Sequence, residues 1–555
     1  MKPIYISFLL FLITTSLFGQ NIIPSDTSKH VADTAKHVAK LDTINPNLGN
    51  EKDQLKVIKA DKIKLHSDSL TPDSVGSQPK KSVKVDTVMQ NKYGDLLKDD
   101  SVYNKKYCIW RPAMEVIGDN IALSLVDSRL LNLQFSKVNV TTWKRTLSAG
   151  WPWNRGWEWD QDRFGNNFLS HPIMGNFYYN DARANGYNFW ASAPFAFAGS
   201  YMWKMFGENG TPEREDIINT TVDGILLGEI LYRISSNILD DRTRGRERFF
   251  RELLAGFVDP MRGFNRLIQG KVFQHTNKEI YGKEPLNITL DAGVNKINNQ
   301  SFAILSGKTS EIINVQFDYG NPFEMRTRSP FDFFKLRVET DFGVGRKSID
   351  NVTGYGILAG KNKEYTKASL LEGGFLYYDY WDNDNFEMSA IALGGGIFSK
   401  LPIGKSSNLY TNAHVGIIPL AGSSTGPVTD TTQYRDYSYG YGAEAKIETS
   451  LSLGKVATIG IVYYYFLIHN FNNTGNNESS EGLLHYGTLG NNSIGILKPK
   501  ISLRLYKDMS IGFEYYMYTQ LHTQENYPTF SSQRNGEKIF LQFYFEDAQR
   551  RGHYD

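Results

Sequence analysis

The sequence predicts an α+β protein with a disordered N-terminal tether, a helical domain and a C-terminal antiparallel transmembrane β-barrel of about 12 strands. Three observations lead to this prediction: an export signal opens the chain, the middle has helical periodicity, and the C-terminal half alternates apolar and polar residues. At 555 residues, the chain exceeds the ~250–300 residues at which single cores stop growing, so several structural units are expected.

Residues 1–19 are predicted to be a secretory signal peptide. In "MKPIYISFLLFLITTSLFGQ", Lys2 precedes an apolar run that ends at Phe18, and small or polar residues follow. The run is shorter than the ~20 residues that a transmembrane helix needs. Cys108 is the only cysteine and lies far from the cleavage region, which argues against lipid attachment there and excludes an intrachain disulfide. We therefore expect an exported protein.

Residues 20–107 are predicted to form a disordered periplasmic linker. They are rich in Ser, Asp, Lys, Thr and Pro, as in "HSDSLTPDSVGSQPKKSVKVDT", and contain few large apolar residues. Burial there cannot repay the entropy of ordering the chain. Such a tether could reach a periplasmic or envelope protein partner. A nucleic-acid partner is not expected, because 61 Lys and Arg residues balance 59 Asp and Glu residues in the whole chain.

Residues 108–280 have the spacing of helices. "RPAMEVIGDNIALSLVDSRLL" places apolar residues along one stripe and has a proline at its start. Only the segment 186–208 approaches the length of a membrane span, and Lys204 with several polar residues interrupts it. This pattern favours helices buried against one another over a helix that crosses a bilayer.

Residues 285–555 are predicted to form the barrel. "YSYGYGAEAKIETSLSL", residues 437–453, alternates without interruption and is longer than the ~5–6 residues of a usual globular strand. Lipid does not tolerate unpaired sheet edges, so strands in a membrane must close into a barrel with a polar lumen. A soluble β-sandwich or propeller also alternates, but its strands are seldom this long.

The alternation assigns the side chains of this strand to two sides. We expect Glu444, Lys446 and Glu448 to face the lumen, and Ala445, Ile447 and Leu451 to face acyl chains. The same face carries three tyrosines that we expect at the boundary between water and lipid: Tyr437, Tyr439 and Tyr441. The predicted location is the outer membrane, in contact with its lipid, with the N-terminal region in the periplasm.

Three motifs in the helical region resemble a known family. They are "WEWDQDRFGNNFLSHPIMGNFYYNDARANGYNFW", "EDIINTTVDGILLGEILYRISSNILDD" and "GFVDPMRGFNRLI", and they follow in the expected order. Together they resemble the domain of unknown function 3943, which occurs in exported proteins of Gram-negative bacteria, over roughly 112–270. The family has no established reaction, so the resemblance implies no mechanism. Its pattern often has a second histidine shortly after His-Pro, where this chain has Met174.

The densest set of chemically active residues lies in the same region. Four residues are candidates for catalysis, because a histidine with several carboxylates could form an acid–base pair or hold a divalent metal: His171, Asp160, Asp162 and Glu208. No metal or cofactor is predicted, since spacing such as His-Glu-x-x-His is absent. Five residues are candidates for binding, partly because several of them share a helix face: Asn180, Arg183, Asn219, Asp223 and Glu229. The alternative is that these are buried polar groups that tie helices together.

Two functions remain open from the sequence. The first is a passage, binding or scaffold component of the cell envelope, with a helical domain that plugs or underlies the barrel and offers the helix face around Asn219 and Asp223 to it. The alternative is an enzyme that modifies envelope lipid or glycan with His171 and nearby carboxylates. The contacts of His171 separate the two: an open cleft beside a carboxylate favours the enzyme, and a packed imidazole favours the first function.

Overall fold

The computed structural model describes most of the chain after Tyr107. The described residues are 108–150, 157–159, 164–277, 279–298, 307–324, 327–343, 349–383, 385–424, 437–471, 489–524 and 528–546. The predicted signal peptide and linker lie outside them, so both stay predictions.

Helices occupy the first part of the described chain. They are α5 (Trp110–Leu125), η1 (Val126–Leu130), α6 (Val140–Gly150), η2 (Asn166–Ser170), α7 (His171–Ala184), α8 (Phe189–Phe206), α9 (Arg214–Ile238), α10 (Gly245–Val258), α11 (Pro260–Ile268) and η3 (Lys271–Phe273). The start of α11 is fixed by Pro260 and by Asp259, whose side chain accepts a hydrogen bond from the Arg262 amide at 3.0 Å. Among the helices that the structure describes, none is both long and apolar enough to cross a membrane.

Strands occupy the rest. They are β1 (Leu286–Asn298), β2 (Lys308–Tyr319), β3 (Thr327–Arg328), β4 (Phe334–Asp341), β5 (Ile349–Tyr365), β6 (Ala368–Asp382), β7 (Glu387–Pro402), β8 (Ser407–Ser424), β9 (Tyr437–Leu453), β10 (Ala457–Asn470), β11 (Gly490–Tyr506), β12 (Met509–Gln524) and β13 (Phe530–Phe545).

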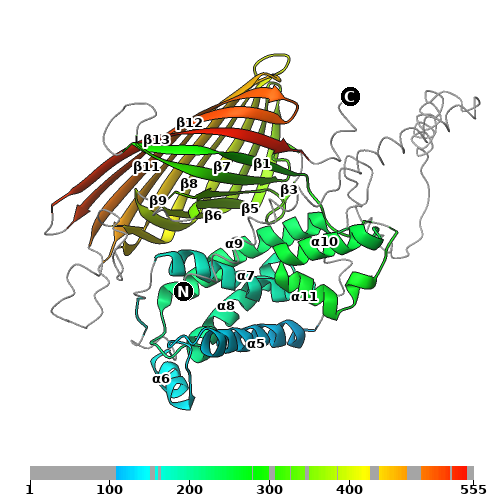
Figure 1. Cartoon of the computed structure of the whole chain (residues 1–555), viewed down its shortest axis with the longest axis vertical. Helices are drawn as coiled ribbons and strands as arrows, with labels where there is room; N and C mark the ends of the chain where they lie inside the picture. The colour runs from blue at the N-terminus through cyan, green and yellow to red at the C-terminus, as the bar shows by residue number, and fades with distance from the viewer. Residues whose placement is uncertain are drawn as a thin grey trace, which may run out of the picture. The chain divides into compact units, whose positions relative to one another are not determined.

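The strands close into a barrel (Figure 1). Neighbours pair in the order β5-β4-β2-β1-β13-β12-β11-β10-β9-β8-β7-β6, and the pairing of β5 with β6 completes the ring. All of these pairs are antiparallel. The two-residue β3 pairs only with β5, beyond the segment of β5 that pairs with β4. The ring therefore has 12 strands, which confirms the predicted fold class.

The barrel encloses charged and aromatic side chains and is apolar outside. On β9, Lys446 is 4% exposed and lines the lumen, whereas its neighbour Ile447 is 48% exposed on the outer wall, as the alternation predicted. Other strands expose large apolar side chains on the same wall: Leu393, Val415, Ile417, Ile459, Ile461, Leu503, Phe513 and Leu541. Antiparallel barrels in lipid have this arrangement.

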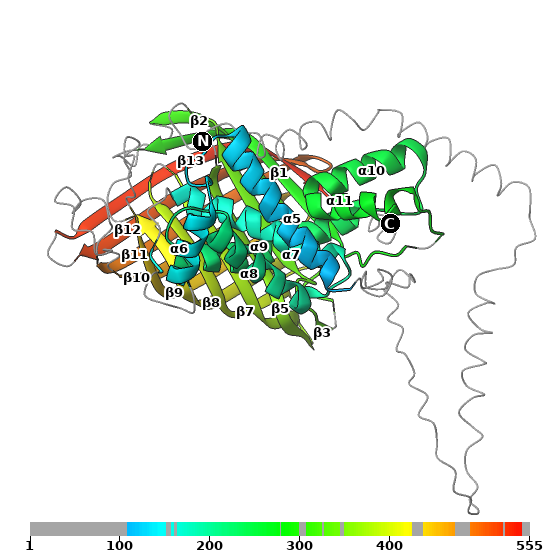
Figure 2. The same ribbon diagram turned by 90° about the horizontal axis from the view of Figure 1, so that it is seen from below.

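The helical domain packs against the outside of this wall. Helix α9 contacts β5, β6 and β7, and Figures 1 and 2 show the helices beside the strands from two directions. One buried apolar cluster joins Phe168 and Leu226 of the helical region to outward-facing residues of the strands, among them Tyr378 and Tyr437. The sequence left open whether these helices plug or underlie the barrel. The described helices do not plug the lumen, because their partners lie on the outer face of the wall.

The same contact corrects the predicted position of two tyrosines. Tyr437 and Tyr439 are 0% exposed, because Phe168 packs against both rings. Only Tyr441 is exposed, as a boundary residue would be. The sequence showed correctly that the three side chains point outward, but not that helices would cover two of them.

Candidate functional site

The candidate residues of the helical domain meet where α7 crosses α9. Gly175 and Gly224 face each other there, and a Cβ on Gly224 would lie 2.5 Å from the Gly175 Cα. Glycine on both helices therefore allows a very close approach. On either side of this crossing, polar side chains are enclosed between α7, α8 and α9.

The first enclosed group is a chain of charges that starts at His171. The His171 Nε2 atom lies 3.2 Å from the Asp216 Oδ1 atom, and its Nδ1 atom lies 3.3 Å from the Thr220 hydroxyl. The other Asp216 oxygen forms an ion pair with Lys204, whose ammonium also contacts Glu208 at 2.6 Å. His171 and Glu208 thus belong to one network but are joined through two other residues.

This network is built around a buried cation. Lys204 also contacts Glu213 at 2.7 Å, so three carboxylates surround its ammonium group. Burial opposes the charge on Lys204, but Asp216, Glu208 and Glu213 together raise the pKa of Lys204 well above its ordinary value. Burial likewise opposes the charge on Asp216, but His171 and Lys204 lower the pKa of Asp216 overall. These ion pairs fix the positions of the charged side chains, which is a structural role.

The second enclosed group is centred on Glu229. Arg183 binds it with two parallel hydrogen bonds, Nε to Oε2 at 2.7 Å and Nη2 to Oε1 at 2.9 Å. Arg233 donates to the same carboxylate at 2.8 Å and the Tyr179 hydroxyl donates at 2.6 Å. Burial opposes ionisation, but the two guanidinium groups lower the pKa of Glu229 to about 2. The Arg183 guanidinium also lies 4.1 Å from the centre of the Tyr232 ring.

The remaining binding candidates are also buried. Asn180 donates to Asn176 at 2.8 Å and to the Gly228 carbonyl at 3.2 Å, and Asn219 donates to the Asn167 carbonyl at 3.1 Å. Asp223 is buried too, and burial, followed by the nearby charge of Asp379, raises the pKa of Asp223 well above its ordinary value.

The structure brings together some of the predicted site and not the rest. Asn180 and Arg183 on α7 contact α9, where Arg183 pairs with Glu229. Asn219 binds η2, and Asp223 interacts electrostatically with Asp379 of β6. The α9 face therefore lies against other helices and the outer wall, and not in the lumen as predicted. Asp160 and Asp162 lie outside the described residues, so their part in the predicted site stays a prediction. Among the described residues, no group of three or more His, Cys, Asp or Glu side chains is arranged to hold a metal ion.

A second polar site lies inside the barrel. The Lys335 ammonium on β4 contacts Glu448 on β9 at 2.8 Å, although five strand-to-strand steps separate these strands in the ring. Trp381 on β6 and Tyr518 on β12 lie on opposite strands, and their ring centres are 6.1 Å apart. The Lys498 ammonium lies 4.7 Å from the Trp381 ring. Side chains therefore bridge the lumen at more than one place.

Sequence spacing indicates some of the observed ion pairs and not others. Lys204 and Glu208 are four residues apart on one helix, as are Glu229 and Arg233, and this spacing favours ion pairs. Lys335 and Glu448 are joined only by the closure of the barrel. No local pattern in the sequence indicates that pair.

Comparison with known proteins supports the family and adds no function. Residues 156–261 match the family model described as "Domain of unknown function (DUF3943)". No curated protein matches the chain.

Solved structures similar to this chain are β-barrels of low sequence identity. The NanC porin shares 7% identity, with 46% of this chain and 98% of the porin covered and a TM-score of 0.24. The outer membrane channel DcaP of Acinetobacter baumannii shares 8% identity, with 47% and 96% covered and a TM-score of 0.20. OmpT of Vibrio cholerae, in its trimer form, shares 8% identity, with 47% and 98% covered and a TM-score of 0.22. At these scores the likeness carries no argument about what this chain does.

Proposed function

From the premise that residues 156–261 are a DUF3943 domain, we propose that this protein is a binding or scaffold component of the outer membrane whose barrel is closed to free passage. The barrel anchors the chain in lipid, and the helical domain is held against its wall. The observation that carries the proposal is the set of contacts that cross the lumen.

Placement in a membrane is supported by the outer wall. Large apolar side chains such as Val415, Ile417 and Ile461 are exposed there in a band, and a soluble protein rarely exposes so large an apolar surface. A closed ring leaves no unpaired sheet edge, as lipid requires.

The connections support a periplasmic position for the N-terminal region. Four of the five connections at the end of the barrel where β1 starts and β13 ends are short turns, 366–367, 403–406, 454–456 and 507–508, and the fifth, 320–333, is longer. The long connections 425–436 and 471–489 join strands at the other end. Barrels of the outer membrane have short turns on the periplasmic side. A predicted tether at 20–107 would then extend into the periplasm, where an envelope protein partner could bind it.

The lumen supports a closed barrel. Several of its charged groups are paired with one another: Lys446 contacts Asp379 at 2.5 Å and Glu444 at 3.0 Å, and Lys500 contacts Asp291 at 2.9 Å. Aromatic rings fill the space beside them, including Phe375, Tyr377, Phe466 and Tyr516, which are buried in one cluster. A solute would have to separate these pairs to pass.

Conductance across a planar lipid bilayer tests this proposal. We expect the full chain, inserted in a bilayer bathed in potassium chloride, to give no steady current. A quadruple variant, Lys335→Ala, Glu448→Ala, Trp381→Ala and Tyr518→Ala, removes the two bridges and should conduct.

The matched control is the double variant Ile447→Ala and Ile461→Ala, which truncates only outward-facing side chains and should stay silent. Insertion of each variant is checked by the heat-dependent shift of its barrel band in gels. Steady current through the unaltered protein would contradict the proposal in favour of a passage. A silent quadruple variant would show that these bridges are not what closes the lumen.

The enzyme hypothesis receives less support from the geometry. Both ring nitrogens of His171 have partners, and its nearest carboxylate, Asp216, also forms an ion pair with Lys204. These contacts fit a packed imidazole. A folded His171→Ala variant that fails to rescue a knockout strain would restore the hypothesis.

A further inference from the structure

The α10–α11 pair has its polar and apolar faces reversed. Phe249 is 62% exposed, and Arg248 beside it is 8% exposed. On α10 the exposed apolar residues recur at the spacing of one helix face, and α11 repeats the pattern: Phe249, Phe250, Leu253 and Leu254, then Phe264, Leu267 and Ile268. A surface helix in water buries such a stripe, so this pair is built to face something other than water.

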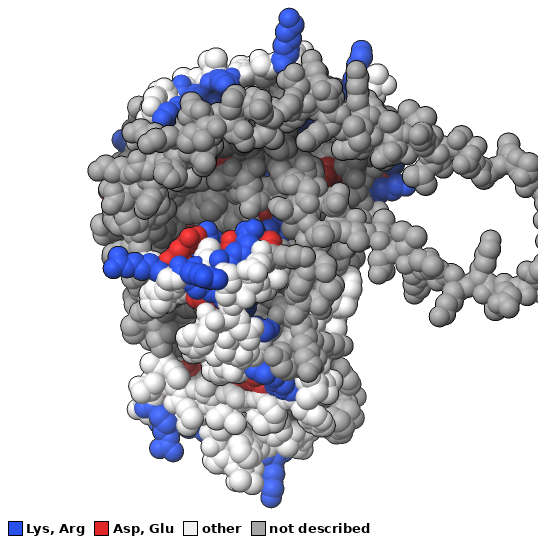
Figure 3. All heavy atoms as spheres, turned by 90° about the vertical axis from the view of Figure 1, so that its right-hand side faces the viewer, with Lys and Arg blue, Asp and Glu red and all other residues white. Residues whose placement is uncertain are grey.

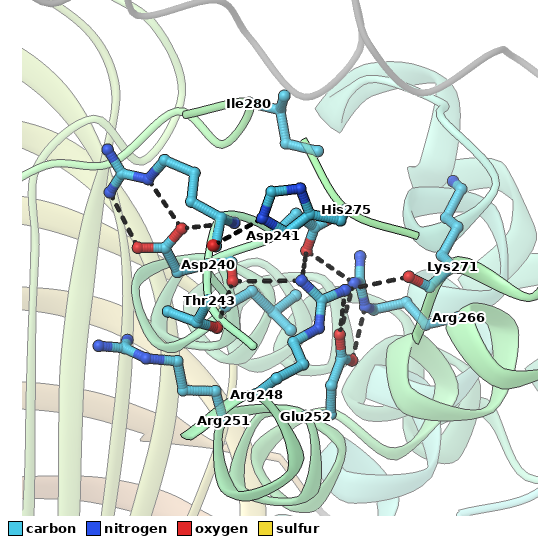
Figure 4. Close-up of polar contacts among 12 residues, drawn as sticks. Asp240, Asp241, Thr243, Arg248, Arg251, Glu252, Arg266, Lys271, His275 and Ile280 are labelled. Carbon is cyan, nitrogen blue, oxygen red and sulfur yellow. Dashed lines mark hydrogen bonds and ion pairs between the residues drawn. The ribbon is translucent and has the colours of Figure 1, made fainter. Parts of the chain in front are cut away.

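The buried face is fixed by arginines (Figure 4). Asp241 accepts from Arg266 at 2.9 Å and contacts Arg248 at 3.0 Å, and Glu252 lies 2.7 Å from each of the same two guanidinium groups. The Tyr281 hydroxyl donates to Asp241 at 2.8 Å. These contacts oppose any rotation of α10 that would turn its phenylalanines inward, because two paired guanidinium groups would have to leave their carboxylates.

The pair lies next to the rim of the barrel at its short-turn end. Asn237 near the end of α9 donates to the Glu284 carbonyl at 2.7 Å, and Lys283 donates to the Leu239 carbonyl at 2.5 Å. Glu284 is two residues before β1, whose first residues pair with the end of β13 at that rim. The face of α10 and α11 is therefore close to the level at which the apolar wall of the barrel ends.

Cations lie at the start of α10. Arg244 and Arg246 are exposed, and Arg246 lies one turn before Phe249 and Phe250. Figure 3 views the molecule from the side on which α10 lies in Figure 1, and it shows charged side chains gathered in a band, with mostly uncharged atoms and scattered Lys and Arg below it. Arginines beside exposed aromatic residues suit the boundary between lipid phosphates and acyl chains.

We propose that the apolar face of α10 and α11 lies in the membrane leaflet beside the short-turn rim, with Arg244 and Arg246 at its phosphate groups. This surface extends the lipid contact of the barrel wall onto the helical domain. The inference rests on the membrane location given under Proposed function. The helical domain then becomes a second lipid-binding element, and this contact sets its depth relative to the bilayer.

Quenching of a fluorophore by lipid-borne nitroxides tests this placement. Cys108 is first replaced by serine, because it is the only cysteine of the chain. Single cysteines then carry the fluorophore in three full-length variants: Leu253→Cys on the proposed lipid face, Glu247→Cys on the same helix and Ile461→Cys on the barrel wall. The variants are reconstituted in vesicles of phosphatidylethanolamine and phosphatidylglycerol that contain doxyl lipid.

We expect quenching at positions 253 and 461 and several-fold less at position 247, whose glutamate is exposed and pairs with Arg251. Replacement of both Arg244 and Arg246 by glutamate should reduce quenching at 253 and leave 461 unchanged. Trypsin digestion patterns confirm that each variant is folded.

The outcomes separate the two proposals. Quenching at 461 without quenching at 253 would overturn the inference and leave the membrane barrel standing. No quenching at either position would overturn the membrane location itself. A label at 253 that escapes the quencher, and whose emission depends on protein density in the vesicle, would assign this face to a second copy of the chain instead.

Discussion

The barrel and the helical domain both enclose charges and expose apolar side chains, but they do so by different means. In the barrel, Lys446 and Ile447 are neighbours in sequence and point to opposite sides of the wall. In the helical domain, Lys204 and Glu229 come from separate helices and meet partners across an interface.

The difference shows what a sequence pattern can predict for strands and for helices. Strand alternation gives each residue a side, and closure of the ring decides which side meets lipid. An apolar stripe shows which side of a helix is apolar, but not whether that side faces a protein core or a membrane. The exposed apolar stripe on α10 is an example, because the sequence does not show what this stripe faces. Four changes test how the two regions differ.

The largest expected effect comes from Glu229→Ala in the helical domain. It leaves Arg183 and Arg233 buried without their carboxylate, and breaking a buried pair in this way costs about 3–5 kcal/mol. Trypsin should then cleave the helical domain much faster, while the barrel keeps its heat-dependent gel shift. Glu247→Ala removes an exposed partner of Arg251 and should change little. Equal sensitivity of the two variants would contradict the structural role of Glu229.

Acid should have a related effect through the same residue. The pKa of Glu229 is lowered from 4.5 to about 2, so its contribution is fully present above about pH 4.5 and is lost as the pH falls toward 2. The contribution is at most roughly 3 kcal/mol, from 1.36 kcal/mol per pKa unit. Hydrogen exchange in α7 and α9 between pH 5 and pH 2.5 measures it. A Glu229→Gln variant should lose this part of the pH dependence, and an unchanged profile would show that other carboxylates cause it.

A smaller loss is expected from Gly224→Ala. The added methyl would lie 2.5 Å from the Gly175 Cα, so α7 and α9 must separate, at a cost of about 1–3 kcal/mol. Gly118→Ala on α5 is the matched control, because a Cβ there meets nothing within 4 Å and alanine favours the helix. The unfolding temperature of the helical domain should fall for Gly224→Ala and rise slightly for Gly118→Ala. The opposite order would mean that the crossing is looser than described.

The last change affects only the attachment of the helices to the wall. Asn167 donates to the hydroxyls of Tyr437 and Tyr439 at 2.8 Å each, so Asn167→Ala leaves two buried hydroxyls without that donor. The expected cost is about 1–3 kcal/mol. Faster hydrogen exchange at the start of α7, with β9 unchanged, would show local release from the wall. Faster exchange in both would indicate instead that the barrel depends on the helices.

The sequence predicted the parts of the fold that local periodicity determines. Alternation located the barrel and assigned Glu444, Lys446 and Ile447 to the correct sides. It could not show that Phe168 covers Tyr437, because an outward tyrosine has the same pattern whether lipid or a helix lies against it.

The candidate site was predicted less completely. His171, Arg183 and Glu229 were identified because unusual polar residues are dense in that region. Their pairing was not, since Arg183 and Glu229 lie on different helices whose contact depends on two glycines. The expected neighbours Asp160 and Asp162 lie outside the described residues. The bridge between Lys335 and Glu448 forms only when the ring closes.

Spin labels placed one at a time from 441 to 453 on β9, in the full chain reconstituted in vesicles, test the central claim most directly. Collision with dissolved oxygen reports lipid, and collision with a water-soluble nickel chelate reports an aqueous surface. We predict that oxygen collisions alternate with a period of two residues and are highest at the odd-numbered positions, 443, 445 and 447. A profile without alternation, or with its maxima at 444, 446 and 448, would contradict a barrel whose apolar wall lies in lipid.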